Sequence, residues 1–162
     1  MITNNIEITT LRSLFFYDEA SGTLRWNAYR NIAAGALAGS LDSQGYRRVR
    51  LFKKWHATHR IVWALATGAY PSGVIDHIDG CRENNRISNL RDVSKLTNAE
   101  NQRNARHHSK SGFLGVSPAF GRWKAQLESR GVKLYLGLFD TREAAHAAYV
   151  AAKREVHEGN TL

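Results

Sequence analysis

The chain has few of the residues that stabilise secreted or membrane proteins. It contains a single cysteine, Cys81, which excludes an internal disulfide framework and a zinc site built from several cysteines. No apolar run approaches the roughly 18 residues of a membrane-spanning helix. The opening stretch, MITNNIEITT, lacks the basic start and apolar core of a signal peptide. We therefore expect a cytoplasmic protein without a membrane partner.

Acidic side chains are also scarce. Lys and Arg number 23 against 14 Asp and Glu, which gives the 162-residue chain a formal net charge of +9. A basic membrane-surface protein would concentrate such charge on one amphipathic helix or beside an apolar span, and the sequence has neither. Nucleic acid is therefore the expected partner.

Short strands separated by glycine turns, mixed with helices, predict an α+β protein. The expected strands are residues 23–26, 47–52, 55–58, 74–75, 90–93, 113–116, 123–128 and 133–138. The expected helices are residues 9–17, 59–67 and 94–107, the last capped by Ser94, and a C-terminal helix capped by Thr141.

One stretch in the first half combines basic and aromatic side chains. Six basic residues and no acidic one lie between Gln44 and Arg60, interleaved with Tyr46, Phe52 and Trp55. Such a mixture is typical of a ribbon that faces phosphates. The candidate DNA contacts of this ribbon are Arg47, Arg48, Arg50, Lys53 and Lys54.

The segment Asp-His-Ile-Asp-Gly, residues 76–80, holds the residue types that phosphodiester hydrolysis needs. A carboxylate is a hard ligand for Mg²⁺ or Mn²⁺, and a neutral imidazole with an ordinary pKa of about 6.5 is a competent base. Adjacent strand residues point to opposite faces, so Asp76 and His77 converge only if the strand ends or bends between them.

Three motifs together, Asp-His-Ile-Asp-Gly, Asn-Asn-Arg-Ile-Ser-Asn-Leu-Arg and Thr-Asn-Ala-Glu-Asn, resemble the core of the HNH endonucleases, a ββα-metal fold. The resemblance implies that His77 is the general base and that Asp76 ligates the metal. Asn89 matches the asparagine that holds the histidine ring by a side-chain hydrogen bond. Asn98 matches the position that completes the metal site, with Asn101 as the alternative ligand.

The same resemblance implies a metal-dependent endonuclease of double-stranded DNA, of the phage homing type, that leaves 5′-phosphate and 3′-hydroxyl ends. Oxygen ligands imply one divalent cation, Mg²⁺ or Mn²⁺, and argue against structural zinc. Arg103 and Arg106 are candidate phosphate contacts. One core holds one site, so a monomer or weak homodimer would nick a strand, in the host cytoplasm or nucleoid.

Other polar residues near these motifs have ordinary structural interpretations. Asn84 and Asn85 are expected in the loop, because asparagine favours turns. His56 and His59 lack further ligands nearby and are expected to pack or to bond to the backbone.

Residues 111–159 resemble the plant ethylene-response-factor (AP-two) DNA-binding domain, through Ser-Gly-Phe-Leu-Gly-Val-Ser, Gly-Arg-Trp-Lys-Ala-Gln and Leu-Gly-Leu-Phe-Asp-Thr-Arg-Glu-Ala-Ala-His-Ala-Ala-Tyr. Such domains lay a three-stranded sheet in the major groove, with a helix behind it. The implied DNA contacts are Arg122, Trp123, Lys124, Gln126, Arg130, Lys133 and Tyr135. Alternation along residues 122–128 is compatible, although it turns Trp123 toward the core.

We divide the chain into a β-rich DNA-contacting segment with a helix (1–70), the ββα-metal core (71–108) and the C-terminal DNA-binding domain (109–162). A DNA-binding regulator with an inactive nuclease core is the alternative function. A nuclease directed at RNA is a third, although stacking aromatics and RNA-recognition motifs are not evident.

Overall fold

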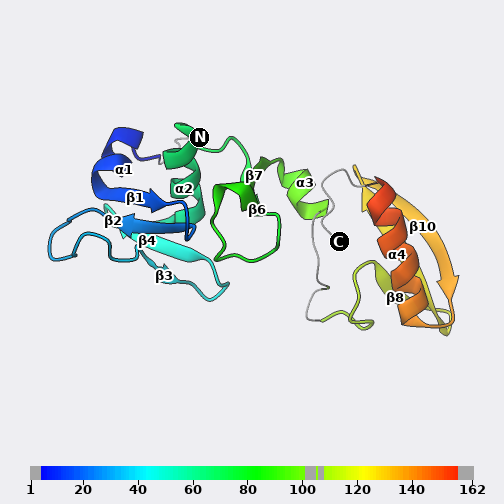
Figure 1. The fold of residues 1–162 in the computed structure, drawn as a ribbon. Helices are drawn as coiled ribbons and strands as arrows, with labels where there is room; N and C mark the ends of the chain where they lie inside the picture. Colours follow the sequence, from blue (N-terminus) through cyan, green and yellow to red (C-terminus); the bar gives the residue numbers. More distant parts are fainter. Residues whose placement is uncertain (1–4, 101–104, 106–107, 157–162) are drawn as a thin grey trace. The chain divides into compact units, whose positions relative to one another are not determined.

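A computed structural model describes residues 5–100, 105 and 108–156 of the chain (Figure 1). Its mixture of helices and antiparallel sheets confirms the α+β class. Two compact units are formed, Met1–Val93 and Ser94–Leu162. Their boundary falls inside the segment 71–108, so the three-part division of the sequence stays a prediction.

The first unit contains two main helices and three small antiparallel sheets. Its elements are α1 (Ile8–Leu14), β1 (Phe15–Asp18), β2 (Thr23–Trp26), β3 (Ser40–Leu41), β4 (Arg47–Leu51), β5 (Lys54–Ala57), α2 (Thr58–Thr67), β6 (Val74–His77), the 3-10 helix η1 (Ile87–Asn89) and β7 (Leu90–Val93). The sheets are β1-β2, β3-β4-β5 and β6-β7. Helix α2 packs against α1 and against strands of the first two sheets.

The core of this unit follows the alternation of its strands. In β4 the apolar Val49 and Leu51 are buried, whereas Arg48 and Arg50 are exposed. The buried face packs with the inner side of α2, where Ile61 is 1% exposed. Burial of apolar area on one face therefore leaves the opposite face of the β3-β4-β5 sheet basic.

The predicted helix over residues 9–17 is too long. Helix α1 ends at Leu14, and Phe15 begins β1, which pairs with β2 in antiparallel register from Phe15 opposite Trp26 to Asp18 opposite Thr23. Hairpin pairing satisfies the backbone and buries Phe15, which outweighs the helical spacing of the apolar residues. The short strand β3 was also not predicted.

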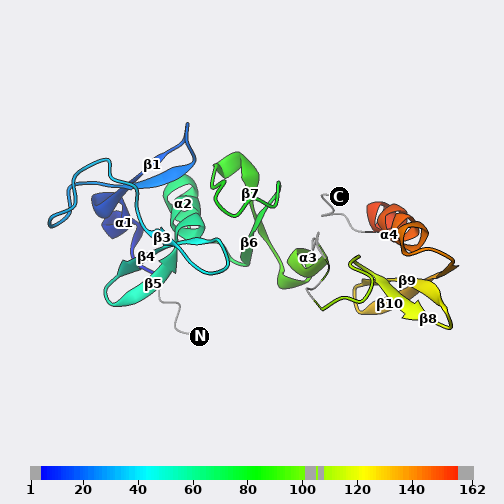
Figure 2. The same cartoon turned by 90° about the horizontal axis from the view of Figure 1, so that it is seen from below.

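The second unit is a three-stranded sheet with a helix on one face. Its elements are α3 (Lys95–Glu100), β8 (Val116–Ala119), β9 (Arg122–Ser129), β10 (Val132–Phe139) and α4 (Arg142–Val156). The strand order is β10-β9-β8, and Figure 2 shows α4 running along one face. Ala125 and Ala145, both 0% exposed, let helix and sheet approach closely.

Both predicted helix caps are confirmed. The hydroxyl of Ser94 accepts a hydrogen bond from the backbone N–H of Thr97 at 3.0 Å, and that of Thr141 from Ala144 at 3.1 Å. Of the predicted helix 94–107, α3 covers Lys95–Glu100. Residues 101–104 and 106–107 lie outside the described residues.

The first strand of this sheet is shifted along the sequence. It was predicted at 113–116, but β8 begins at Val116, because Ser111 folds the preceding segment into a turn. Its hydroxyl donates to the carbonyl of Val116 at 2.8 Å and accepts from the N–H of Phe113 at 3.1 Å. Pro118 is tolerated because β8 is an edge strand.

Candidate active site and nucleic-acid interface

The hairpin of β6 and β7 carries the two residues that the sequence places at the centre of the site. Asp76 pairs with Arg91 and His77 with Leu90, and the register continues without a bulge. The strand therefore does not bend between Asp76 and His77, and their side chains lie on opposite faces. His77 is 6% exposed, and Asp76 is partly buried.

Asp76 forms an ion pair that the sequence did not predict. Arg91, its partner across the hairpin, donates from Nε at 2.8 Å and from Nη2 at 2.7 Å, both to Oδ2 of Asp76. Charge-assisted bonds of this kind are shorter and stronger than bonds between neutral groups. The register of β6 and β7 decides which residue lies opposite Asp76, and this register cannot be read from the sequence.

The donor chemistry suits a hard divalent cation. Asp76 offers a carboxylate oxygen, a hard donor, and this carboxylate is already paired with Arg91. Within residues 5–100, 105 and 108–156, no three His, Cys, Asp or Glu residues group as metal ligands. Asn98, the other ligand that the resemblance implies, is exposed on α3, and its role as a ligand stays a prediction.

His77 is held by an asparagine other than the one that the resemblance implies. Its Nε2 lies 2.9 Å from Oδ1 of Asn85, and both side chains are buried. Asn89, the residue that matches the family position, has its described side-chain hydrogen bonds elsewhere. The expectation that Asn85 lies in the loop is confirmed, but its contact with the ring was missed.

Asn89 organises the loop instead. Its Nδ2 donates to Oδ1 of Asp79 at 2.9 Å and to the carbonyl of Asn84 at 2.8 Å, while its Oδ1 accepts from the N–H of Asp79 at 3.0 Å. Desolvation opposes ionisation of Asp79, but hydrogen bonds from Asn84, Cys81 and Asn89 outweigh it and lower its pKa. The loop is thus fixed at both ends.

Aromatic rings pack around His77. The ring of His59 lies edge-on at 5.4 Å between centroids, and Tyr46 lies 5.4 Å from His59 and 6.1 Å from His77. Burial, with smaller contributions from the charges of His77 and Arg60, lowers the pKa of His59 from 6.5 to about 4. The expected packing role of His59 is confirmed, and its partner is the candidate base.

The exposed face of the β3-β4-β5 sheet carries the basic residues predicted to contact DNA. Arg48 and Arg50 project from it, and Trp55, opposite Arg50, is 53% exposed. Lys53 lies at the tight β4–β5 turn. Arg47 is already engaged, donating to the carbonyl of Gly39 at 2.9 Å and to Glu83 at 3.1 Å.

In the second unit, side chains of β9 and β10 form the sheet face opposite α4. Gln126 pairs with Tyr135, which is 64% exposed, and Glu128 pairs with Lys133. Trp123 packs with the apolar cluster on the α4 side, as the alternation predicts. The DNA-contact roles of these residues stay predictions.

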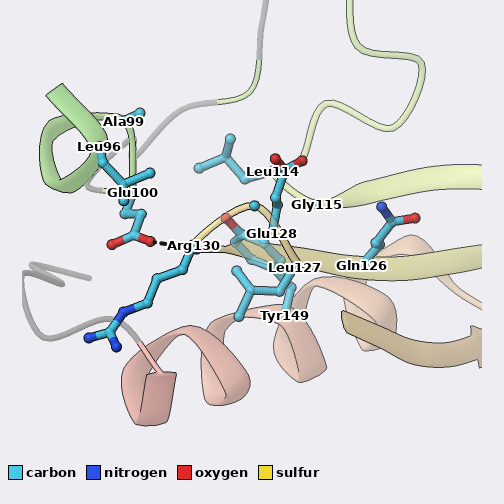
Figure 3. A pocket seen from close by; sticks show the side chains of 11 residues that line it. Leu96, Ala99, Glu100, Leu114, Gly115, Gln126, Leu127, Glu128, Arg130 and Tyr149 are labelled. Carbon is cyan, nitrogen blue, oxygen red and sulfur yellow. Dashed lines mark hydrogen bonds between the residues drawn. The ribbon is translucent and has the colours of Figure 1, made fainter. Parts of the chain in front are cut away.

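Helix α3 is attached to this C-terminal sheet. Oε1 of Glu100 accepts from the backbone N–H of Arg130 at 3.3 Å and from the hydroxyl of Ser129 at 3.4 Å, beside a groove of about 360 Å³ (Figure 3). Asn98 therefore belongs to the second unit. The candidates Asn101, Arg103 and Arg106 lie outside the described residues.

Comparison with known proteins identifies the central segment. Residues 56–103 match the HNH endonuclease family model. The chain is 38% identical over 88 residues to the DNA endonuclease I-HmuI of Bacillus phage SP01. The aligned region covers 51% of this chain and 47% of the relative. The chain thus spans about half the length of this relative.

The other comparisons add little about the remaining segments. No solved structure matches the chain. The resemblance of residues 111–159 to the ethylene-response-factor domain stays a prediction. Among the described residues, no helix is long and apolar enough to cross a membrane.

Proposed function

Because residues 56–103 are an HNH endonuclease domain, we propose that this chain is a metal-dependent endonuclease that nicks double-stranded DNA. The observation that carries the proposal is the placement of His77. It ends strand β6, its ring is buried, and Asn85 and His59 hold that ring. A base in a fixed orientation is what general base catalysis requires.

In the proposed reaction, the imidazole of His77 takes a proton from a water molecule. The resulting hydroxide attacks phosphorus, and the bond from phosphorus to the 3′ oxygen breaks. The 3′ oxygen then takes a proton from solvent, leaving 3′-hydroxyl and 5′-phosphate ends. One site breaks one bond, so a single molecule nicks.

Asp76 is the proposed metal ligand of the first unit, on the face of β6 opposite His77. Asn98, in the second unit, stays the other ligand that the sequence resemblance implies. A bound Mg²⁺ or Mn²⁺ would stabilise the negative charge on the leaving 3′ oxygen. Asp76 supplies a carboxylate, a hard oxygen ligand, which is paired with Arg91 across the hairpin.

DNA binding is proposed for the basic sheet face of each unit. In the first unit, Arg48 and Arg50 would contact phosphates around the cut strand, with Lys53 and Lys54 from the turn. In the second unit, the open face of β9 and β10 would enter the major groove. Gln126 there can read an adenine edge, whereas lysines mainly set salt-dependent affinity.

The test is cleavage of supercoiled plasmid that contains a binding site for the protein, with Mg²⁺, Mn²⁺ or EDTA. We expect open circles with either metal, none with EDTA, and a loss of at least about 100-fold in His77→Ala. His108→Ala, at an exposed histidine of the second unit, serves as the matched control. Binding without metal-dependent cutting would favour the regulator.

A further inference from the structure

We infer that Asn85 is the positioning residue of the base, and that it fixes His77 with the proton on Nε2 and the accepting lone pair on Nδ1. This inference rests on the proposed function, because it refines how His77 acts there. Asn85 touches the ring and not the reacting atoms, so its effect passes through His77.

The contact between Asn85 and His77 determines which ring nitrogen carries the proton. Oδ1 of Asn85 lies 2.9 Å from Nε2 of His77. A carbonyl oxygen can only accept, so a hydrogen bond between these atoms requires the proton on Nε2. A neutral imidazole has one N–H, and Nδ1 is then the nitrogen that can take a proton from water.

Packing around His77 does not determine which ring nitrogen carries the proton. His59 and Tyr46 fix the plane of the His77 ring, at centroid distances of 5.4 and 6.1 Å. Ring contacts of this kind do not distinguish a protonated nitrogen from a bare one. The amide oxygen of Asn85, which faces Nε2, does, and the pair is buried, with Asn85 4% exposed, so water competes little for the bond.

The backbone of Asn85 is itself held in place. Tyr17 donates from its hydroxyl to the carbonyl of Asn85 at 3.5 Å, and the same hydroxyl accepts from the N–H of Ile87 at 3.0 Å. On the other side, Asn89 donates to the carbonyl of Asn84 at 2.8 Å. Asn89 therefore affects the orientation of the His77 ring only indirectly, because it holds the loop in which Asn85 lies.

The first arm of the test reads the tautomer directly. Long-range proton–nitrogen NMR of ¹⁵N-histidine-labelled full chain, at a pH of about 8 where an ordinary imidazole is neutral, reports which ring nitrogen carries hydrogen. The His77 signals are identified by their loss in His77→Gln. We expect the Nε2–H form in the wild type and in Asn85→Asp, and a mixture in Asn85→Leu.

The second arm measures single-turnover nicking with saturating protein. Asn85→Leu should slow nicking by about 10- to 100-fold without weakening DNA binding, because part of the general-base contribution is lost. Asn85→Asp keeps an acceptor and should recover to within about tenfold of wild type. The neighbouring change Asn84→Leu tests whether loop disturbance alone has this effect; it should lower the rate less than about threefold.

The inference would be overturned by a wild-type ring protonated on Nδ1, or by wild-type nicking in a folded Asn85→Leu. Equal losses in Asn84→Leu and Asn85→Leu, with the tautomer unchanged, would also overturn it. If the wild type does not nick at all, the proposed function fails, and the tautomer still decides the role of Asn85. The wild-type tautomer and Asn85→Asp decide it as well if Asn85→Leu does not fold.

Discussion

The burial of a neutral histidine beside His77 predicts that mild acid destabilises the first unit. Burial, together with the charges of His77 and Arg60, lowers the pKa of His59 from 6.5 to about 4. Between about pH 6.5 and pH 4 the unfolded chain therefore binds a proton that the folded chain does not. Unfolding is favoured as the pH falls through this range, whereas above it His59 has no effect on the pH dependence.

The size of this destabilisation follows from the change in the pKa of His59. Each pKa unit corresponds to about 1.4 kcal/mol, so a change from 6.5 to about 4 gives an upper limit of about 3 kcal/mol at pH 4. Small domains are typically stable by about 5 to 15 kcal/mol. The protonation of one side chain would thus remove a substantial fraction of the stability of this unit.

The assay compares urea unfolding of the wild type and His59→Phe between about pH 4 and pH 7.5, a range that spans the ordinary and the lowered pKa. Phenylalanine keeps a ring against His77 and does not titrate. Tryptophan fluorescence mainly follows the first unit, which contains Trp26, Trp55 and Trp63. The stability of the variant relative to wild type should rise by about 2 to 3 kcal/mol on going to pH 4.

The control for this prediction is the replacement of an exposed histidine in the other unit. His108→Phe changes an exposed histidine of the second unit and should leave the pH dependence as in the wild type. Parallel curves for wild type and His59→Phe across the whole pH range would refute the claim that His59 is buried and neutral.

Two further substitutions test packing and electrostatics. Gly115→Ala should destabilise the second unit by more than about 2 kcal/mol in thermal unfolding, because its Cβ would collide with the buried ring of Tyr149 at a positive φ. Gly112→Ala, at a positive φ with open space, should cost only about 1 kcal/mol, and equal losses would contradict the packing. Desolvation raises the pKa of Asp92, but hydrogen bonds from residues 72–73 outweigh it and lower the pKa. This stabilisation is present above the unfolded pKa and is lost as the pH falls through the folded one. Asp92→Asn should therefore cost about 1 to 2 kcal/mol in urea unfolding at pH 7 and less at pH 3; a loss independent of pH would argue against an ionic contribution.

Local patterns were sufficient for much of the architecture. Turn residues and alternation predicted the strands over 90–93 and 23–26, and side-chain oxygens predicted the caps Ser94 and Thr141. All of these signals act within a few residues of the chain. Where local signals competed with distant pairing they failed. Residues 15–17 have helical spacing but pair with β2, because pairing is decided by a partner elsewhere in the chain.

The residue types of the candidate site were readable from the sequence, because the motif around residues 76–80 supplies a carboxylate and an imidazole side by side, in a segment that matches the HNH endonuclease family model. Which groups contact them was not. The pairing of Arg91 with Asp76 depends on strand register, and the contact of Asn85 with His77 depends on how a loop closes. Sequence spacing favoured Asn89 for that contact, because motifs record separation along the chain, whereas a hydrogen bond depends on separation in space.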